Sequence, residues 1–211
     1  MEKNKIAFQG EKGAYSHIAC EEIYKDAEIE NCATFEETFK IAFENEDVKA
    51  IIPLENSLAG RVADIHYLLP KYKLQIYGEH FQKVEHCLLC KKEAELKDIK
   101  YIRSHAQAIG QCQNIIKKNK FKPIISADTA GSAKDLADSK DKSIAAIASE
   151  LAAKIYDLKI LERNIEDETG NVTRFLIMGK NVKQPEHEKS KKYITSCIFR
   201  LKSEPSALYK S

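Results

Sequence analysis

The chain has 211 residues, of which 43% are hydrophobic and 31% charged, which is typical of a soluble globular protein with one domain or two small lobes. Its 34 basic and 32 acidic residues nearly cancel, and a net charge of +2 gives no indication of a nucleic-acid or membrane-surface partner. No stretch approaches the roughly 20 apolar residues of a transmembrane helix, and the charged N-terminus lacks the apolar core of a signal peptide.

The first elements follow each other closely. Residues 5–10 (KIAFQG) predict a strand, and the glycine-containing turn after it leads into a helix from about Ser16 to Lys25. Thr34 and Glu37 form a capping box, which predicts the start of a second helix. The β-branched run that begins at residue 48 predicts a strand that stops at Pro53.

Strands and helices continue to alternate after this point. A helix is expected from Ser57 to about Leu69, and another from His105 to about Asn119. Asp128 or Thr129 is expected to cap the next helix along the chain. Further strands are expected at 74–81, 84–92, 100–104, 122–127 and in the first half of 143–158, whose Ala-rich second half predicts a helix. This alternation predicts an α/β architecture with a largely parallel sheet.

The last third of the chain changes character twice. Residues 171–178 (NVTRFLIM) look like a buried strand, but burying an unpaired Arg174 would cost several kcal/mol. Arg174 therefore either faces solvent, forms an ion pair, or meets an anionic ligand. Residues 179–192 are charged and Lys-rich, which indicates a linker, and the single strand and part-helix expected beyond it cannot bury a core alone.

Three strand-to-helix turns are unusually polar. They are PLENSLAG (53–60), SHAQAIGQC (104–112) and DTAGSAK (128–134). Plain capping by Ser57 or Ser104 explains each turn locally. In α/β folds, however, ligands gather where strands end and helices begin, and three such turns exceed what capping requires. Together with NVTRF they predict a cleft for a small anion.

Other kinds of site are disfavoured. The sequence has no GxGxxG, P-loop or HExxH motif, so nucleotide and zinc-protease signatures are missing. Cys87 and Cys90 form a lone CxxC without the second pair that a zinc site needs, and we expect two core residues. Cys112 lies mid-helix at an apolar position, which disfavours a nucleophilic role. All six cysteines are expected to be reduced thiols in a cytoplasmic protein.

Taken together, five motifs resemble those of the prephenate dehydratase family. They occur in the family's order as GEKGAYS, PLENSLAG, SHAQAIGQC, DTAGSAK and NVTRF, spanning residues 10–175. Ala106 stands where the family commonly has Pro, and Gly110 lies inside the helix that carries Gln107 and Gln111, but neither change removes a polar group. The tail TSCIFRLKSEPSALYK resembles the opening of the ACT domain that senses phenylalanine in this family, with Ser206 replacing a usual Gly.

The resemblance implies a domain organisation. The fold would be a two-lobed, periplasmic-binding-protein-like α/β dehydratase domain with the active site in the inter-lobe cleft. The catalytic domain would cover 1–178, with lobe one at about 1–77 and 160–178 and lobe two at about 78–159. Residues 179–192 would be the linker and 193–211 the incomplete beginning of an ACT-type regulatory domain.

The resemblance also implies a reaction, the conversion of prephenate to phenylpyruvate with loss of CO2 and of the ring hydroxyl as water. No cofactor and no metal would be needed, because aromatisation provides the driving force. Arg174 would bind a substrate carboxylate, and Thr173 would donate a hydrogen bond to the leaving hydroxyl. Glu55 would either supply a proton behind Thr173, if burial raises its pKa, or only orient Asn56 and Ser57.

Neutral groups would position the substrate in this scheme. Asn56 joins Thr173 and Glu55 as a catalytic candidate, and Phe175 is expected to pack. The substrate-binding candidates, besides Arg174, are Ser16, Ser57, Ser104, Gln107, Gln111, Thr129, Ala130 and Phe175.

Several alternatives stay open at this point. An arogenate dehydratase would perform the same reaction on the transaminated substrate. A non-catalytic two-lobe module that binds a small anion would keep Arg174 but would have no use for Thr173. The chain could also be the core of a longer regulated enzyme, in which phenylalanine acts as an effector only if the ACT domain is complete. Homodimers or homotetramers are usual in the family.

Overall fold

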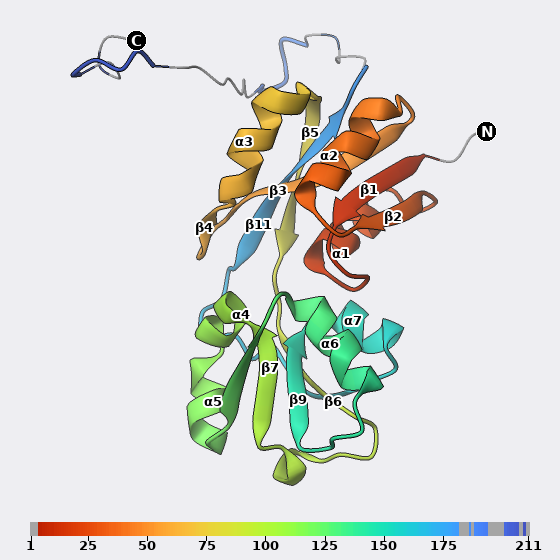
Figure 1. Cartoon of the computed structure of the whole chain (residues 1–211), viewed down its shortest axis with the longest axis vertical. Helices are drawn as coiled ribbons and strands as arrows, with labels where there is room; N and C mark the ends of the chain where they lie inside the picture. The colour runs from red at the N-terminus through yellow and green to blue at the C-terminus, as the bar shows by residue number, and fades with distance from the viewer. Residues whose placement is uncertain (1–3, 182–185, 187, 194–200, 207–208, 210–211) are drawn as a thin grey trace.

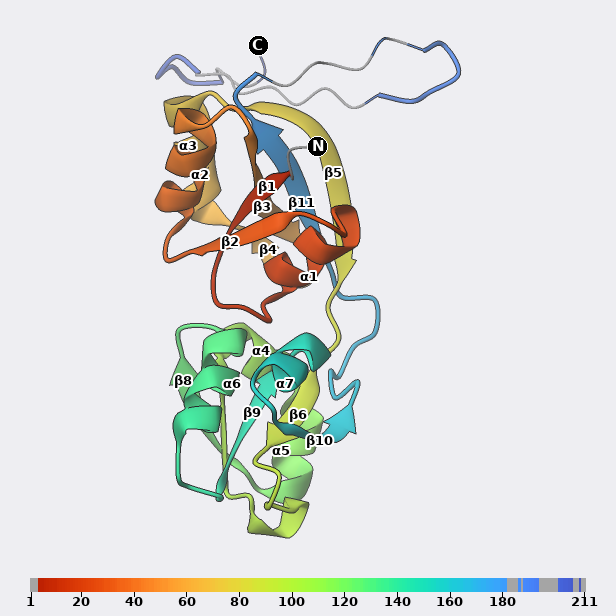
Figure 2. The ribbon, with the colours of Figure 1, turned by 90° about the vertical axis from the view of Figure 1, so that its right-hand side faces the viewer.

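The computed structural model describes residues 4–181, 186, 188–193, 201–206 and 209. They form two lobes stacked along the long axis of the molecule (Figures 1 and 2). Each lobe contains one β-sheet with helices on both of its faces, so the predicted α/β fold in two lobes is confirmed. Parts of the expected linker (179–192) and of the ACT-like tail (193–211) fall outside the described residues, and both assignments stay predictions.

Lobe one is built around a sheet with the strand order β2-β1-β3-β11-β5, to which β4 adds a short pair with β3. Its strands are β1 (Lys5–Gln9), β2 (Glu28–Cys32), β3 (Val48–Asn56), β4 (Gly60–Arg61), β5 (Gln75–Lys83) and β11 (Val172–Gly179). Its helices are α1 (Tyr15–Ile23), α2 (Phe35–Glu44) and α3 (Ala63–Tyr72). α1 packs against one face, where Phe8 and Phe175 are buried, and α2 and α3 cover the other around Phe39.

Lobe two contains a sheet with the order β10-β6-β9-β7-β8. Its strands are β6 (Cys87–Cys90), β7 (Tyr101–His105), β8 (Lys122–Ser126), β9 (Ile144–Ala148) and β10 (Lys159–Arg163). Its helices are the 3-10 turn Leu96–Asp98, α4 (Ala106–Gln111), α5 (Gln113–Asn119), α6 (Thr129–Asp138) and α7 (Glu150–Ile155). Small Ala side chains at 133, 146, 148, 152 and 153 let α6 and α7 pack closely on this sheet.

The expectation of a largely parallel sheet is wrong, because both sheets are mixed. In lobe one, β11 lies between β3 and β5 and runs antiparallel to both. In lobe two, β6 is antiparallel to β9 and β10, whereas β7 is parallel to β8 and β9. Apart from the short pairing of β4 with β3, every antiparallel pairing involves β5, β6, β10 or β11, the strands that carry the chain from one lobe to the other and back.

Two expected boundaries around Pro53 are also wrong. β3 continues through Pro53 to Asn56, because the register against β11 skips Leu54 and this bulge accommodates the residue without an N–H. The helix expected from Ser57 begins only at Ala63, after the two residues of β4. Consequently Ser57 is not an N-cap: its hydroxyl accepts a hydrogen bond from the backbone N–H of Val172 at 3.0 Å and ties β3 to β11.

The helix expected from His105 to Asn119 is broken at Cys112 into α4 and α5. The break is stabilised from outside the helix. The carboxylate of Asp167 accepts hydrogen bonds from the backbone N–H groups of Gln113 (2.7 Å) and Asn114 (2.9 Å), which are the first residues of α5. Asp167 belongs to the segment that returns to lobe one, so this cap fixes α5 relative to the crossing.

The chain crosses between the lobes at residues 84–86 and 164–171, and the two crossings are hydrogen-bonded together. The N–H of Val84 donates to the carbonyl of Asn171 at 2.8 Å, and the N–H of Ile165 donates to the carbonyl of His86 at 3.0 Å. Within the described residues, no helix combines the length and apolar character that crossing a membrane requires.

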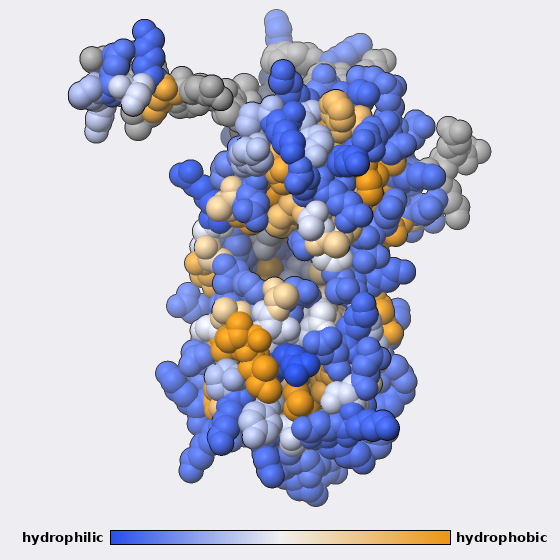
Figure 3. Space-filling model, in the orientation of Figure 1, coloured by the Kyte–Doolittle hydropathy of each residue, from blue (hydrophilic) through white to orange (hydrophobic). Residues whose placement is uncertain are grey.

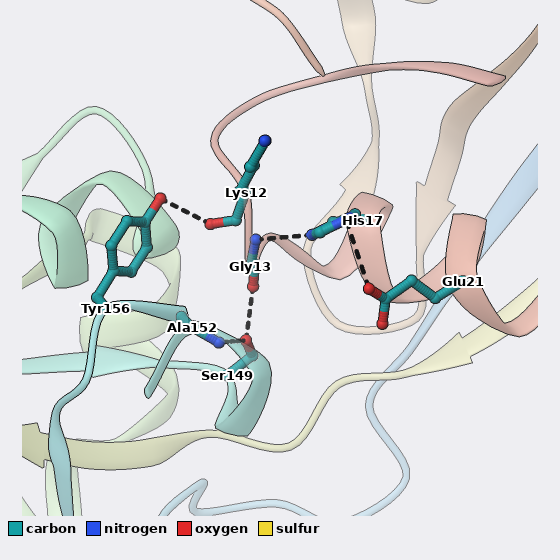
Figure 4. Close-up of polar contacts among 7 residues, drawn as sticks. All are labelled: Lys12, Gly13, His17, Glu21, Ser149, Ala152 and Tyr156. Atoms are coloured by element: carbon teal, nitrogen blue, oxygen red, sulfur yellow. Dashed lines mark hydrogen bonds and ion pairs between the residues drawn. The ribbon is translucent and has the colours of Figure 1, made fainter. Parts of the chain in front are cut away.

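A second contact joins the lobes at the turn before α1, shown in Figure 4. The hydroxyl of Ser149, the N-cap of α7, donates to the carbonyl of Gly13 at 2.6 Å, and that of Tyr156 donates to the carbonyl of Lys12 at 2.9 Å. Gly13 has φ +90°, and a Cβ there would lie 2.7 Å from Cα of Ala152. Its N–H donates to Nδ1 of His17 at 3.0 Å. The glycine turn of the first motif therefore seats lobe one on lobe two.

Candidate active site

A cleft of about 620 Å³ lies between the lobes, visible as the hollow at mid-height in Figure 3. Polar turns that follow strands in both lobes open onto it, as expected where strands end in α/β folds. Its lining includes Tyr15, Asn56, Arg61, Asp64, His86, His105, Gln107, Gln111, Asp128, Thr129, Asn171 and Thr173.

The amide of Asn56, at the end of β3, has a defined orientation. Its Oδ1 accepts hydrogen bonds from the backbone N–H groups of Leu58 (3.0 Å) and Ala59 (2.8 Å). A backbone N–H can only donate, so the other amide atom must be the Nδ2 group with its two protons. The two backbone donors therefore decide which polar atom Asn56 presents to its other neighbours.

Thr173, on β11, receives one of those protons. Nδ2 of Asn56 lies 2.9 Å from Oγ1 of Thr173 and 2.7 Å from Oδ1 of Asn171. The Thr173 oxygen accepts in this contact, so its own O–H proton is free to be donated elsewhere. Thr173 lines the cleft. This arrangement presents one neutral hydroxyl donor to a molecule bound there.

The hydrogen bonds continue from Asn171 to His86 with defined directions. Because Oδ1 of Asn171 faces Asn56, its Nδ2 is the group that donates to Oε1 of Gln111 at 3.0 Å. Oε1 of Gln111 also lies 3.0 Å from Nε2 of His86, so that nitrogen must carry a proton. Burial lowers the pKa of His86, which keeps its imidazole neutral and leaves Nδ1 as an acceptor.

Tyr15, from the first motif, completes this chain of contacts. Its hydroxyl lies 2.9 Å from Nδ1 of His86 and 2.7 Å from the carbonyl of Glu85. Its one proton is shared between these two acceptors. Burial raises the pKa of Tyr15 well above 10, so the phenol keeps its proton. A continuous neutral network thus runs from lobe one through Asn56, Asn171, Gln111 and His86 and back to Tyr15.

The buried histidines predict how stability changes with pH. Burial lowers the pKa of both His17 and His86 below the ordinary value of 6.5, against the nearby carboxylates Glu21 and Glu166, which raise it. Below pH 6.5 the unfolded chain therefore binds protons that the folded chain does not. We expect stability to be level above this pH and to fall below it, by at most about 1.4 kcal/mol per pH unit for each histidine.

Thermal unfolding of the wild type and of His86→Gln between pH 5 and pH 7.5 checks this expectation. The variant is expected to be less stable at pH 7.5 but to lose less stability on acidification. His66 lies exposed on α3, so His66→Gln serves as the control that keeps the wild-type profile. A wild-type profile that is flat, or that rises toward pH 5, would contradict the assignment.

The structure brings five of the predicted site residues to the cleft: Asn56, Gln107, Gln111, Thr129 and Thr173. Three others are buried in the lobes instead. Ser104 is fully buried and donates to the carbonyl of Ile147 at 2.7 Å, Ala130 is fully buried in α6, and Phe175 packs in the core of lobe one. Ser16 on α1 and Ser57 are not part of the cleft lining either.

Arg174 and Glu55 lie on a different face from Thr173, because successive side chains of a strand point to opposite sides. Nη1 of Arg174 lies 3.1 Å from Glu55, and Nη2 lies 2.7 Å from Glu79. Of the three possibilities that the sequence left open for Arg174, the structure thus shows the ion pair. Glu55 is exposed and outside the cleft lining, which removes the burial on which its predicted role as a proton source depended.

Three residues of the network were missed as site candidates from the sequence: Tyr15, His86 and Asn171. Tyr15 and Asn171 belong to two of the five motifs. Tyr15 directly precedes the candidate Ser16, and Asn171 lies two positions before Thr173, on the same side of the strand. His86 precedes Cys87 in what reads as a plain apolar strand, and no local signal marks it.

The cysteines that the structure describes take no part in the site. The five in the described part of the chain, Cys20, Cys32, Cys87, Cys90 and Cys112, are buried free thiols. Burial raises the pKa of Cys87 to about 11 and also raises that of Cys112, so neither is an activated nucleophile. The prediction that Cys87 and Cys90 are core residues is confirmed. No group of three or more potential metal ligands occurs among the described residues.

Known proteins match this chain over both lobes. The family model described as prephenate dehydratase covers residues 6–183. A bifunctional N-acyl-homoserine lactone acylase/prephenate dehydratase of Komagataeibacter europaeus is 41% identical over 209 residues, which cover 98% of this chain and 73% of that protein. Arogenate dehydratase/prephenate dehydratase 2, chloroplastic, of Arabidopsis thaliana is 37% identical over 207 residues, 98% of this chain but 54% of that protein.

A solved structure gives the same picture. Prephenate dehydratase of Arthrobacter aurescens, in complex with L-Phe, is 26% identical with a TM-score of 0.80, over 87% of this chain and 63% of that one. The chain thus spans about half the length of the Arabidopsis relative and less than two thirds of the solved one.

Proposed function

Because the chain belongs to the prephenate dehydratase family, we propose that its cleft converts prephenate to phenylpyruvate, CO2 and water. The family prediction made from the five motifs is confirmed, and with it the prediction of a lyase. The observation that supports this activity most directly is the geometry of the Thr173 hydroxyl. Its oxygen accepts a hydrogen bond from Asn56, so its own proton can be donated to a molecule in the cleft.

The reaction breaks two bonds. The electron pair of the ring–carboxylate bond moves into the ring as CO2 departs, and the ring expels its hydroxyl group at the opposite carbon. The hydroxyl oxygen gains negative charge as it leaves, so a donor placed there stabilises the transition state more than the bound substrate. Thr173 is suited to this role as a hydrogen-bond donor, because a neutral hydroxyl is too weak an acid to protonate substrate beforehand.

The neutral surroundings suit the loss of CO2. The groups linked to Thr173 are the amides of Asn56, Asn171 and Gln111 and the neutral imidazole of His86. A cation beside the departing carboxylate would stabilise its charged ground state more than the transition state, in which that charge is leaving. Gln111 and Gln107, on one face of α4, are proposed to hold the ring from the side of lobe two.

A second candidate activity is the dehydration of arogenate, which carries an ammonium group where prephenate has a keto group. One observation favours it: Asp64, in the first turn of α3, lines the cleft and offers a carboxylate to an ammonium group. The Arabidopsis relative carries both activities in its name.

Turnover of the two substrates tests these activities. We expect the wild type to form phenylpyruvate from prephenate, measured by absorbance in alkali, and any phenylalanine formed from arogenate to be measured by chromatography. Asp64→Asn is expected to lower kcat/KM for arogenate more than for prephenate. If the wild type turns over neither prephenate nor arogenate, the non-catalytic anion-binding module becomes the better account.

Regulation and assembly are proposed from the family alone. The L-Phe bound to the A. aurescens relative supports phenylalanine as an effector, provided a complete ACT domain is present. A homodimer or homotetramer is proposed as the assembly.

A further inference from the structure

We infer that Arg61 binds the substrate carboxylate that survives the reaction, the role that the sequence suggested for Arg174. This inference rests on the proposed function, since it names the group that holds the substrate of that reaction. A dianion must meet a fixed positive charge somewhere in the cleft, and the network around Thr173 is neutral.

Arg61 is the only Lys or Arg among the described residues that line the cleft. It is also the only described arginine for which the structure shows no carboxylate partner. Arg103 pairs with Asp135, Arg163 with Glu150, and Arg174 with both Glu55 and Glu79. An exposed guanidinium with all five N–H donors available can form two parallel hydrogen bonds to a carboxylate.

The position of Arg61 connects it to the reacting groups. β4 pairs with β3 so that Gly60 lies opposite Asn56 and Arg61 lies opposite Glu55. Asn56 is the residue that fixes Thr173. Arg61 is therefore one ladder position away from the residue that orients the proposed donor. As the cross-strand partner of Glu55 it shares the face of Glu55 and Arg174. It lines both the groove on that face and the cleft, so it lies at the rim between the two.

The positive charge that can attract an anion here is that of the Arg61 guanidinium itself. α3 begins immediately after Arg61, but Asp64 in its first turn offsets the partial positive charge of the first N–H groups of this helix. Asp128, the other acidic residue of the lining, is the N-cap of α6 and offsets that helix in the same way.

The chemistry selects which carboxylate Arg61 holds. The ring carboxylate becomes neutral CO2, so a strong ion pair there would retard the reaction. The side-chain carboxylate keeps its charge in substrate, transition state and product, and an ion pair to it binds all three equally. Loss of Arg61 should therefore raise KM and leave kcat nearly unchanged.

The test compares wild type, Arg61→Gln and Arg61→Lys in turnover of prephenate and in inhibition by phenylpyruvate, whose only carboxylate is the surviving one. Arg61→Gln is expected to raise both KM and the inhibition constant by about 10- to 100-fold, the usual contribution of a hydrogen bond to a charged group. Arg61→Lys, which keeps the charge but loses the fork, should lie in between. Arg163→Gln is the control, since Arg163 pairs with Glu150 outside the cleft.

The outcomes separate this inference from the proposed function. A wild type that turns over prephenate, with Arg61→Gln unchanged in both constants, overturns the role of Arg61 alone. That role is equally overturned if Arg174→Gln, and not Arg61→Gln, raises the inhibition constant. If the wild type does not turn over prephenate but binds phenylpyruvate in calorimetry, and Arg61→Gln weakens that binding, the carboxylate site stands and the proposed function fails. If the wild type neither turns over prephenate nor binds phenylpyruvate, both fail.

Discussion

Thr173→Ala is expected to lower kcat about 100- to 1,000-fold, the usual loss when a donor to developing negative charge is removed. The reason is geometric: Nδ2 of Asn56, 2.9 Å away, occupies the Thr173 oxygen and leaves its proton to the leaving group. Because this interaction forms mainly in the transition state, kcat and kcat/KM should fall together. Initial rates of phenylpyruvate formation over a range of prephenate concentrations measure both.

Thr173→Ser is the matched control, since it keeps the hydroxyl and removes only a methyl group. It should retain most of the activity that Thr173→Ala loses. Both variants should unfold near the wild-type temperature, because Thr173 is only partly buried at the edge of the cleft. A loss of less than tenfold in Thr173→Ala, with the fold intact, would mean that Thr173 is an ordinary strand residue.

Gly13→Ala is expected to disturb the seating of one lobe on the other. A Cβ at this position would lie 2.7 Å from Cα and 2.8 Å from Cβ of Ala152, and backbone atoms cannot move aside cheaply. The φ of +90° adds strain for any residue with a side chain. Together these effects should cost about 2–4 kcal/mol of stability. Activity should fall as well, since Tyr15 and Gln111 reach the cleft from different lobes.

Gly60→Ala is the matched control that separates the backbone strain of a positive φ from the steric clash with Ala152. Gly60 has a similar φ of +82°, but a Cβ there would meet nothing within 4 Å. Its replacement should cost only the strain, about 1–2 kcal/mol. Thermal unfolding measures the difference between the two variants, and small-angle X-ray scattering shows whether Gly13→Ala changes the overall dimensions. Equal destabilisation by both would show that the contact with Ala152 contributes nothing.

The contrast between Thr173 and Arg174 shows how far the motifs alone could lead. Both residues belong to one motif, and both were expected to face the substrate. In a strand, however, neighbours face opposite sides, so at most one of them could reach the cleft directly. The alternation was available from the sequence, but the choice of face was not, because it depends on which side of β11 the second lobe occupies.

The elements that were missed share a physical cause. β2 and β10 are edge strands with largely exposed side chains, so they lack the apolar pattern by which the central strands were predicted. The continuation of β3 through Pro53 depends on a bulge against β11, a partner more than one hundred residues away. The polar turns were predictable because helix starts and strand ends leave local signals, whereas the network from Asn56 to Tyr15 exists only once both lobes are assembled.

The placement of β11 has a consequence for the order in which the molecule can form. During synthesis, the ribosome delivers β1 to β5 first, but the gap between β3 and β5 can be filled only by residues 172–179. Lobe two, from β6 to β10, is complete before that strand emerges. The nascent chain must therefore hold an unfinished sheet with two open inner edges while the inserted lobe folds. Thr173 lies on the closing strand, so the hydroxyl proposed to be catalytic and the final sheet are completed in the same event.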